Sequence, residues 1–122
     1  MNAANAIVAV RDPALASSLE LALEAGAIVA ILWNPEHGLE DLPLDDASTL
    51  IVEHSLLTPD PATFIAGLRQ RPWFGLVILM TGDGEALSPR VGEARRVTIL
   101  EMPFQAAALI AAIRAQWPDN RH

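Results

Sequence analysis

The stretch TLIVEHS, residues 49–55, decides how the rest of the chain is arranged. It begins as an unbroken apolar run, with polar residues before it and two prolines soon after it. A short apolar run between such boundaries is typical of a strand that is buried on both faces of a parallel sheet. Glu53, His54 and Ser55 follow one another at its end, and α/β domains place their sites at the carboxyl ends of parallel strands. We therefore expect the functional site at the end of this strand.

Four other apolar runs are predicted to be strands, and helical segments alternate with them. The predicted strands are residues 6–10, 27–32, 75–81 and 97–100. Segments with apolar residues every three or four positions, the spacing of one helix face, are residues 13–25, 61–71 and 105–116. Weaker helical segments are residues 85–94 and, as no more than a short helix or turn, residues 36–48.

Local signals mark where two of the helices begin. In Asp12-Pro13 and in Asp60-Pro61, the aspartate can cap a helix by accepting backbone N–H groups, and the proline suits the first helical position. Gly26 is expected to end the first helix. We accordingly expect Asp12 to cap a helix rather than to bind a metal.

Strands that alternate with helices predict a parallel sheet with helices on both faces, joined by right-handed crossovers. Five such units fit a doubly wound α/β domain with strand order 2-1-3-4-5. A length of 122 residues suits one core, and the sequence has neither a linker nor an internal repeat. Residues 1–122 are therefore predicted to form a single domain.

The composition excludes several classes of protein. A hydrophobic content of 52% argues against disorder, and the formal charge of −7 argues against nucleic-acid binding, which needs a basic surface. No apolar run approaches the roughly 20 residues of a membrane span. There is no cysteine, and the first residues lack the basic start of a secretory signal, so we expect a cytoplasmic protein.

The order of these segments resembles the receiver domain of bacterial two-component response regulators over nearly the whole chain. Receivers carry an acidic pair after the first strand, a phosphorylated Asp after the third, a Thr or Ser after the fourth and Lys-Pro after the fifth. The corresponding stretches here are VRD at residues 10–12, EHS at 53–55, LMTG at 79–82 and LEMPF at 100–104. The resemblance implies a flavodoxin-like (CheY-like) three-layer sandwich.

The chain departs from the receiver pattern where the chemistry is done. Arg11 replaces one of the acidic pair, although Mg²⁺ takes oxygen ligands. Met102 replaces the Lys that would neutralise an incoming phosphoryl group, and Ile99 replaces an aromatic residue that receivers commonly have. Asp12 and Thr81 remain, so the resemblance implies a vestigial pocket formed by Arg11, Asp12, Thr81 and Met102.

Two alignments place different residues at the phosphoacceptor position, and neither places an Asp there. Counting back from Pro59 selects Ser55, whereas counting along the apolar residues of the strand selects Glu53. We prefer Glu53. The alignment that selects Ser55 would leave the Glu53 carboxylate facing the core without a partner, and burying an unpaired carboxylate is costly.

The resemblance therefore implies a degenerate, non-enzymatic receiver (a pseudo-receiver) that binds a protein partner without phosphorylation, cofactor or Mg²⁺. The expected partner is a histidine kinase or a regulator, or a second copy. The second copy would bind through the fourth helix (residues 85–94), the fifth strand (97–100) and the fifth helix (105–116), a face that spans roughly residues 85–117. We expect Trp33, Trp73 and Trp117 to be partly buried anchors, and Trp73-Phe74 is the best candidate for an exposed contact. Two alternatives stay open. One is a phosphoacceptor receiver that uses Glu53 or Ser55, and the other is a domain that binds a small molecule beside Arg11, Thr81 and Met102.

Overall fold

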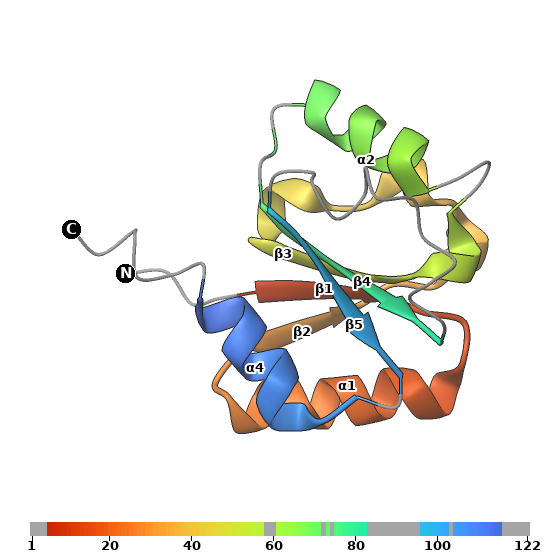
Figure 1. Ribbon diagram of the computed structural model, residues 1–122. Helices are drawn as coiled ribbons and strands as arrows, with labels where there is room; N and C mark the ends of the chain where they lie inside the picture. The colour runs from red at the N-terminus through yellow and green to blue at the C-terminus, as the bar shows by residue number, and fades with distance from the viewer. Residues whose placement is uncertain are drawn as a thin grey trace.

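The computed structural model describes residues 5–57, 61–71, 73, 75–82, 96–102 and 104–115. Five parallel strands form one sheet in the order β2-β1-β3-β4-β5 (Figure 1), which confirms the predicted α/β class and strand order. The strands are β1 (Asn5–Ala9), β2 (Val29–Leu32), β3 (Thr49–Glu53), β4 (Leu76–Thr81) and β5 (Val97–Glu101). The third strand thus ends two residues before its predicted end.

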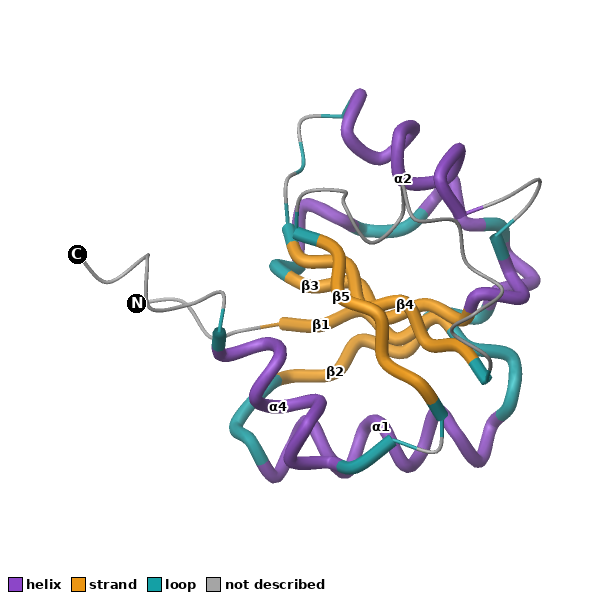
Figure 2. Tube along the Cα trace, in the orientation of Figure 1, coloured by secondary structure: helices purple, strands orange, loops and turns teal. Residues whose placement is uncertain are grey.

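Helical segments cover both faces of the sheet, so the domain has three layers (Figure 2). The helices are α1 (Pro13–Ala25), α2 (Pro61–Gln70) and α4 (Ala106–Arg114). Helices α1 and α4 lie on one face. On the other face lie α2 and three short 3-10 turns, namely η1 (Pro35–His37), η2 (Leu39–Asp41) and η3 (Leu44–Asp46). The helix predicted within residues 85–94 lies outside the described residues. Within the described part of the chain, no helix is long and apolar enough to cross a membrane.

Alternate residues of the inner strands fill two separate cores. In β4, Ile78 and Met80 pack with α1 and α4, whereas Val77 and Leu79 pack with α2. Every residue of this strand is buried, as expected for a central strand of a doubly covered sheet. The period of two in the strands therefore fixes which side chains meet which helix layer.

The first helix begins at Asp12-Pro13 and is followed by Gly26, as predicted, but the glycine serves packing rather than a left-handed turn. Asp12 has an extended backbone, and its Oδ1 accepts the Ala14 N–H at 2.9 Å, which confirms the helix cap. Gly26 follows the helix with an ordinary φ of −95°, and Ala27 takes the left-handed conformation with φ 63°. A Cβ on Gly26 would lie 2.6 Å from Cδ1 of Ile110. The glycine thus allows α4 to approach the end of α1.

Trp73, which follows α2, is anchored rather than exposed. It is 7% exposed, and its indole Nε1 donates to the carbonyl of Ala47 at 2.9 Å, so it is an anchor, as expected, and not the exposed contact for which it was the best candidate. Phe74 lies outside the described residues. The guanidinium of Arg69 lies 5.8 Å from the Trp73 ring centroid and donates to the carbonyl of Gly75 at 3.1 Å. Burial, and then the nearby charge of Arg96, lower the pKa of Arg69. These contacts join the beginnings of β3 and β4.

Candidate functional site

Four of the residues singled out from the sequence lie at one edge of the sheet. Glu53 is the last residue of β3 and pairs with Met80, which comes directly before Thr81 at the end of β4. Thr81 in turn pairs with Glu101, the last residue of β5, and Met102 follows it. Arg11 lies two residues after the end of β1, the other neighbour of β3. The parallel register therefore brings Arg11, Glu53, Thr81 and Met102 to the same edge.

The carboxylate of Glu53 is held by the loop that follows β1. Its Oε1 accepts the backbone N–H of Arg11 at 2.5 Å. Glu53 is half-buried and Arg11 is exposed, so the contact lies at the rim of the sheet. No sequence signal could have indicated this partner, because the donor is a backbone group 42 positions away.

Ser55 does not end the strand. It lies in a 3-10 turn, η4 (His54–Leu56), that begins directly after Glu53, and its side chain is exposed. The turn is closed by the Leu57 N–H, which donates to the carbonyl of His54 at 3.1 Å. Of the two residues considered for the acceptor position, Glu53 is thus the one that stands at the carboxyl end of β3.

Asp12 is engaged locally. One of its carboxylate oxygens caps α1 through the Ala14 N–H, and the Asp12 carbonyl accepts the Ala16 N–H at 2.9 Å. The side chain is exposed at the start of the helix. Within the described residues, no three of His, Asp, Glu or Cys lie close enough together to hold a metal ion.

Thr81 and Met102 join the ends of β4 and β5. Thr81 is 3% exposed, and its carbonyl accepts the Met102 N–H at 2.7 Å. Met102 is half-buried, and its side chain packs against the core that lies under α1 and α4. After β5, this end of the sheet therefore carries an apolar side chain, part of whose surface is in the core.

A shallow depression of about 460 Å³ lies beside Met102. It is lined by Asp12, Ala14, Leu15 and Ser18 from the start of α1, and by Met102 and Phe104 after β5. Most of this lining is apolar. Chemically, the edge thus offers a carboxylate that already accepts a backbone N–H, a buried threonine and a thioether.

Solved structures with a similar fold include response regulator receiver domains. One from Clostridium thermocellum matches with a TM-score of 0.79 at 15% identity and covers 97% of each chain. A CheY-like receiver domain from Methylobacillus flagellatus matches with a TM-score of 0.78 at 16% identity, over 93% of this chain and 98% of that one. A sensor protein from a Polaromonas species matches with a TM-score of 0.76 at 19% identity, over 95% and 97% of the two chains. The chain therefore has the CheY-like fold.

The sequence itself gave no match to a family model or to a curated protein.

Proposed function

We propose that this chain is a receiver-like module of two-component signalling that binds a protein partner without accepting a phosphoryl group. The CheY-like fold of the described residues and the placement of Glu53 at the end of β3 support the receiver-like part of the proposal. The hydrogen bond from the Arg11 N–H to the Glu53 carboxylate is the observation that carries the rest of it.

This hydrogen bond gives Oε1 of Glu53 a backbone N–H as its partner. In a metal site, a carboxylate oxygen would instead be a ligand of the ion. Mg²⁺ is bound through carboxylate, carbonyl and water oxygens, in a nearly octahedral arrangement. At this edge the loop after β1 presents an N–H group to Glu53, and the same residue carries a guanidinium. The one carboxylate of this loop, Asp12, caps α1. These features favour a Glu53 carboxylate that keeps its negative charge over one that binds a divalent cation.

Phosphoryl transfer would also lack the cationic side chain that receivers have after the fifth strand. Positively charged groups stabilise the charge that develops on a transferring phosphoryl group. Met102 has no charge, and part of its side chain packs into the core. Glu53 thus takes the acceptor position as an unmodified carboxylate, and the module has one state rather than two.

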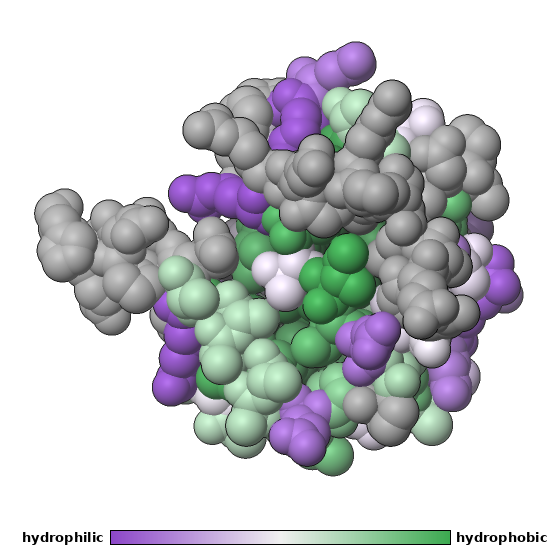
Figure 3. All heavy atoms as spheres, in the orientation of Figure 1, coloured by the Kyte–Doolittle hydropathy of each residue, from purple (hydrophilic) through white to green (hydrophobic). Residues whose placement is uncertain are grey.

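We propose that the partner is a histidine kinase or regulator, or a second copy, and that it binds the face formed by α4 and β5. The outward surface of α4 carries small residues, with Ala106, Ala107 and Ala111 exposed. Figure 3 shows this weakly hydrophobic surface continuing onto more hydrophobic residues over β5. Small side chains would let a partner helix approach closely. Size-exclusion chromatography with light scattering tests the second-copy form, since Ala107→Glu should dissociate a dimer and leave the fold intact.

Incubation with a small acyl-phosphate donor and Mg²⁺, followed by intact-mass spectrometry, tests the absence of phosphorylation. The expected result is an unchanged mass. A gain of one phosphoryl group on Glu53 or Ser55 would overturn this part of the proposal in favour of a phosphoacceptor receiver. Glu53→Ala and Ser55→Ala variants would then identify the labelled residue.

A further inference from the structure

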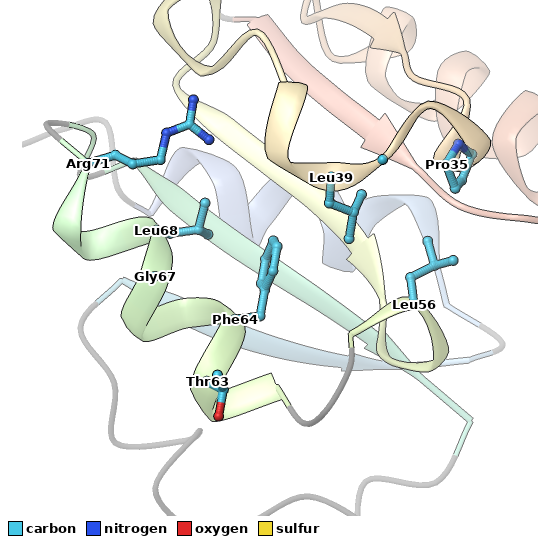
Figure 4. Close-up of a pocket in the computed structure, with 9 residues that line it drawn as sticks. Pro35, Leu39, Leu56, Thr63, Phe64, Gly67, Leu68 and Arg71 are labelled. Carbon is cyan, nitrogen blue, oxygen red and sulfur yellow. The ribbon is translucent and has the colours of Figure 1, made fainter.

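A groove of about 550 Å³ lies between α2 and the 3-10 turns η1 and η2 (Figure 4). Its size falls within the range of roughly 300–1,000 Å³ that is usual for small-molecule sites. Apolar side chains form most of its lining, namely Pro35, Leu39, Leu56, Phe64 and Leu68. Arg11, Glu53, Thr81 and Met102 do not line it. The groove is therefore a second candidate site, distinct from the strand ends.

Phe64 and Leu39 form the central part of the groove. Figure 4 shows the Phe64 ring rising from α2 toward the Leu39 side chain, with Pro35 and Leu56 toward the far end. Phe64 and Leu39 are both half-buried, so part of each apolar surface remains in contact with water. Covering that surface with an apolar ligand would be favourable, by about 25 cal/mol for each Å² removed from water.

Arg71 supplies a charged group at the other end. Among the described residues of the lining it is the only charged one, and it is half-buried just after α2. Within the described part of the chain, its side chain makes neither a hydrogen bond nor an ion pair. A guanidinium can bind a carboxylate through two parallel hydrogen bonds. The groove thus has an apolar body and one cationic end.

Gly67 keeps the groove open at a cost to the helix. It lies inside α2, where glycine is less favourable than alanine by about 1 kcal/mol. A Cβ at this position would meet no atom within 4 Å in the part of the chain that the structure describes, and no left-handed φ is found here, so the described packing and backbone do not require the glycine. The space over Gly67 belongs to the groove. A larger side chain could therefore fill the groove without disturbing the core.

We propose that this groove binds an amphipathic monocarboxylate, with its apolar body between Phe64 and Leu39 and its carboxylate on Arg71. From residue 64 to residue 71 the helical rise is about 10 Å, a length that suits a medium-chain acyl group. The net charge of −7 offers such an anion no general attraction. Recognition consequently depends on Arg71 and on the apolar lining, and it is independent of the signalling role proposed above.

Titration with decanoate, followed by amide NMR, tests this proposal. The readouts are the amides of Gly38 and Gly67 and the indole N–H of Trp33, which donates to the carbonyl of Gly38 at 3.0 Å. We expect saturable shifts confined to these groups. Decanol should bind at least about tenfold more weakly, because a hydrogen bond to a charged group contributes roughly 1.5–3 kcal/mol.

Three variants make the test specific. Gly67→Leu should abolish the shifts by filling the groove, and Arg71→Gln should weaken binding at least about tenfold. Ala66→Leu is the matched control, because residue 66 is also exposed on α2 but does not line the groove, and it should bind like the wild type. Thermal melts show that each variant is folded, and Arg71→Gln leaves the apolar contacts of α2 in place.

Three outcomes would overturn the proposal. The first is the absence of saturable shifts in the wild-type protein. The second is equal binding by the Gly67→Leu and Ala66→Leu variants, which would place the ligand elsewhere. The third is equal binding of decanoate and decanol together with no effect of Arg71→Gln, which would show that the ligand's carboxylate does not contribute to binding.

Discussion

The backbone N–H of Arg11, after β1, donates to the side-chain carboxylate of Glu53 at the end of β3. The bond joins two adjacent parallel strands at the edge where sites of this fold are built. Arg11 thus acts on Glu53 through its backbone, while the residue itself is exposed. The negative charge at the strand end is satisfied within the chain.

Removing the Glu53 carboxylate should destabilise this edge. Glu53→Ala should lower the free energy of unfolding by about 1 kcal/mol, because the Arg11 N–H loses its acceptor. Glu53→Gln retains an oxygen in the same position and should cost less than half as much. Urea denaturation measures both values, and equal losses in the two variants would contradict the assigned hydrogen bond.

Asp12 should behave as a helix cap. Asp12→Ala should cost about 1 kcal/mol of stability through loss of the acceptor for Ala14, whereas Asp12→Asn should be nearly neutral because Asn caps equally well. Denaturation with and without Mg²⁺ provides the check. A large loss for Asp12→Asn that appears only when Mg²⁺ is present would instead indicate a metal ligand.

Glycine should be required at Gly75 and dispensable at Gly82. A Cβ on Gly75 would lie 2.3 Å from the Trp73 ring and 2.5 Å from the carbonyl oxygen of Ser48, so Gly75→Ala should cost about 1–3 kcal/mol. At Gly82, an added Cβ meets no atom of the described residues within 4 Å, so Gly82→Ala should change stability by no more than about 0.5 kcal/mol. Thermal melts of the two variants compare them directly, and similar melting temperatures would refute the packing of Trp73.

The left-handed turn after α1 predicts a stabilising substitution. Ala27 has φ 63°, a conformation that costs a residue with a Cβ roughly 1 kcal/mol and costs glycine little. Ala27→Gly should therefore raise the melting temperature. Ala22→Gly, inside the helix, should lower it by at least a comparable amount. A fall in melting temperature for both variants would show that residue 27 does not adopt this conformation.

The strand order could be predicted because periodicity and the alternation of strand and helix are local signals. The cap at Asp12 is equally local. The sequence left Trp73 open between an anchor and an exposed contact, because it stands between two periodic segments, where no pattern indicates which way a side chain points. Its burial depends on Ala47, which is 26 positions away.

The contacts that define the two candidate sites were harder to foresee. The partner of Glu53 is a backbone N–H on another strand, so no side-chain pattern encodes it. The groove beside Gly67 exists because short 3-10 turns occupy residues 35–46, the region whose sequence gave the weakest prediction. Both sites depend on how distant segments approach one another in three dimensions.

An amide NMR titration with millimolar Mg²⁺, and then with a beryllium fluoride mimic of the phosphoryl group, tests the central claim most directly. The positive control is a variant that restores the receiver pattern, with Arg11→Asp, Glu53→Asp and Met102→Lys combined. We predict no shifts of Arg11, Glu53 and Thr81 in the wild-type protein, and saturable shifts at these positions in the variant. Saturable shifts of the same residues in the wild-type protein would contradict the account.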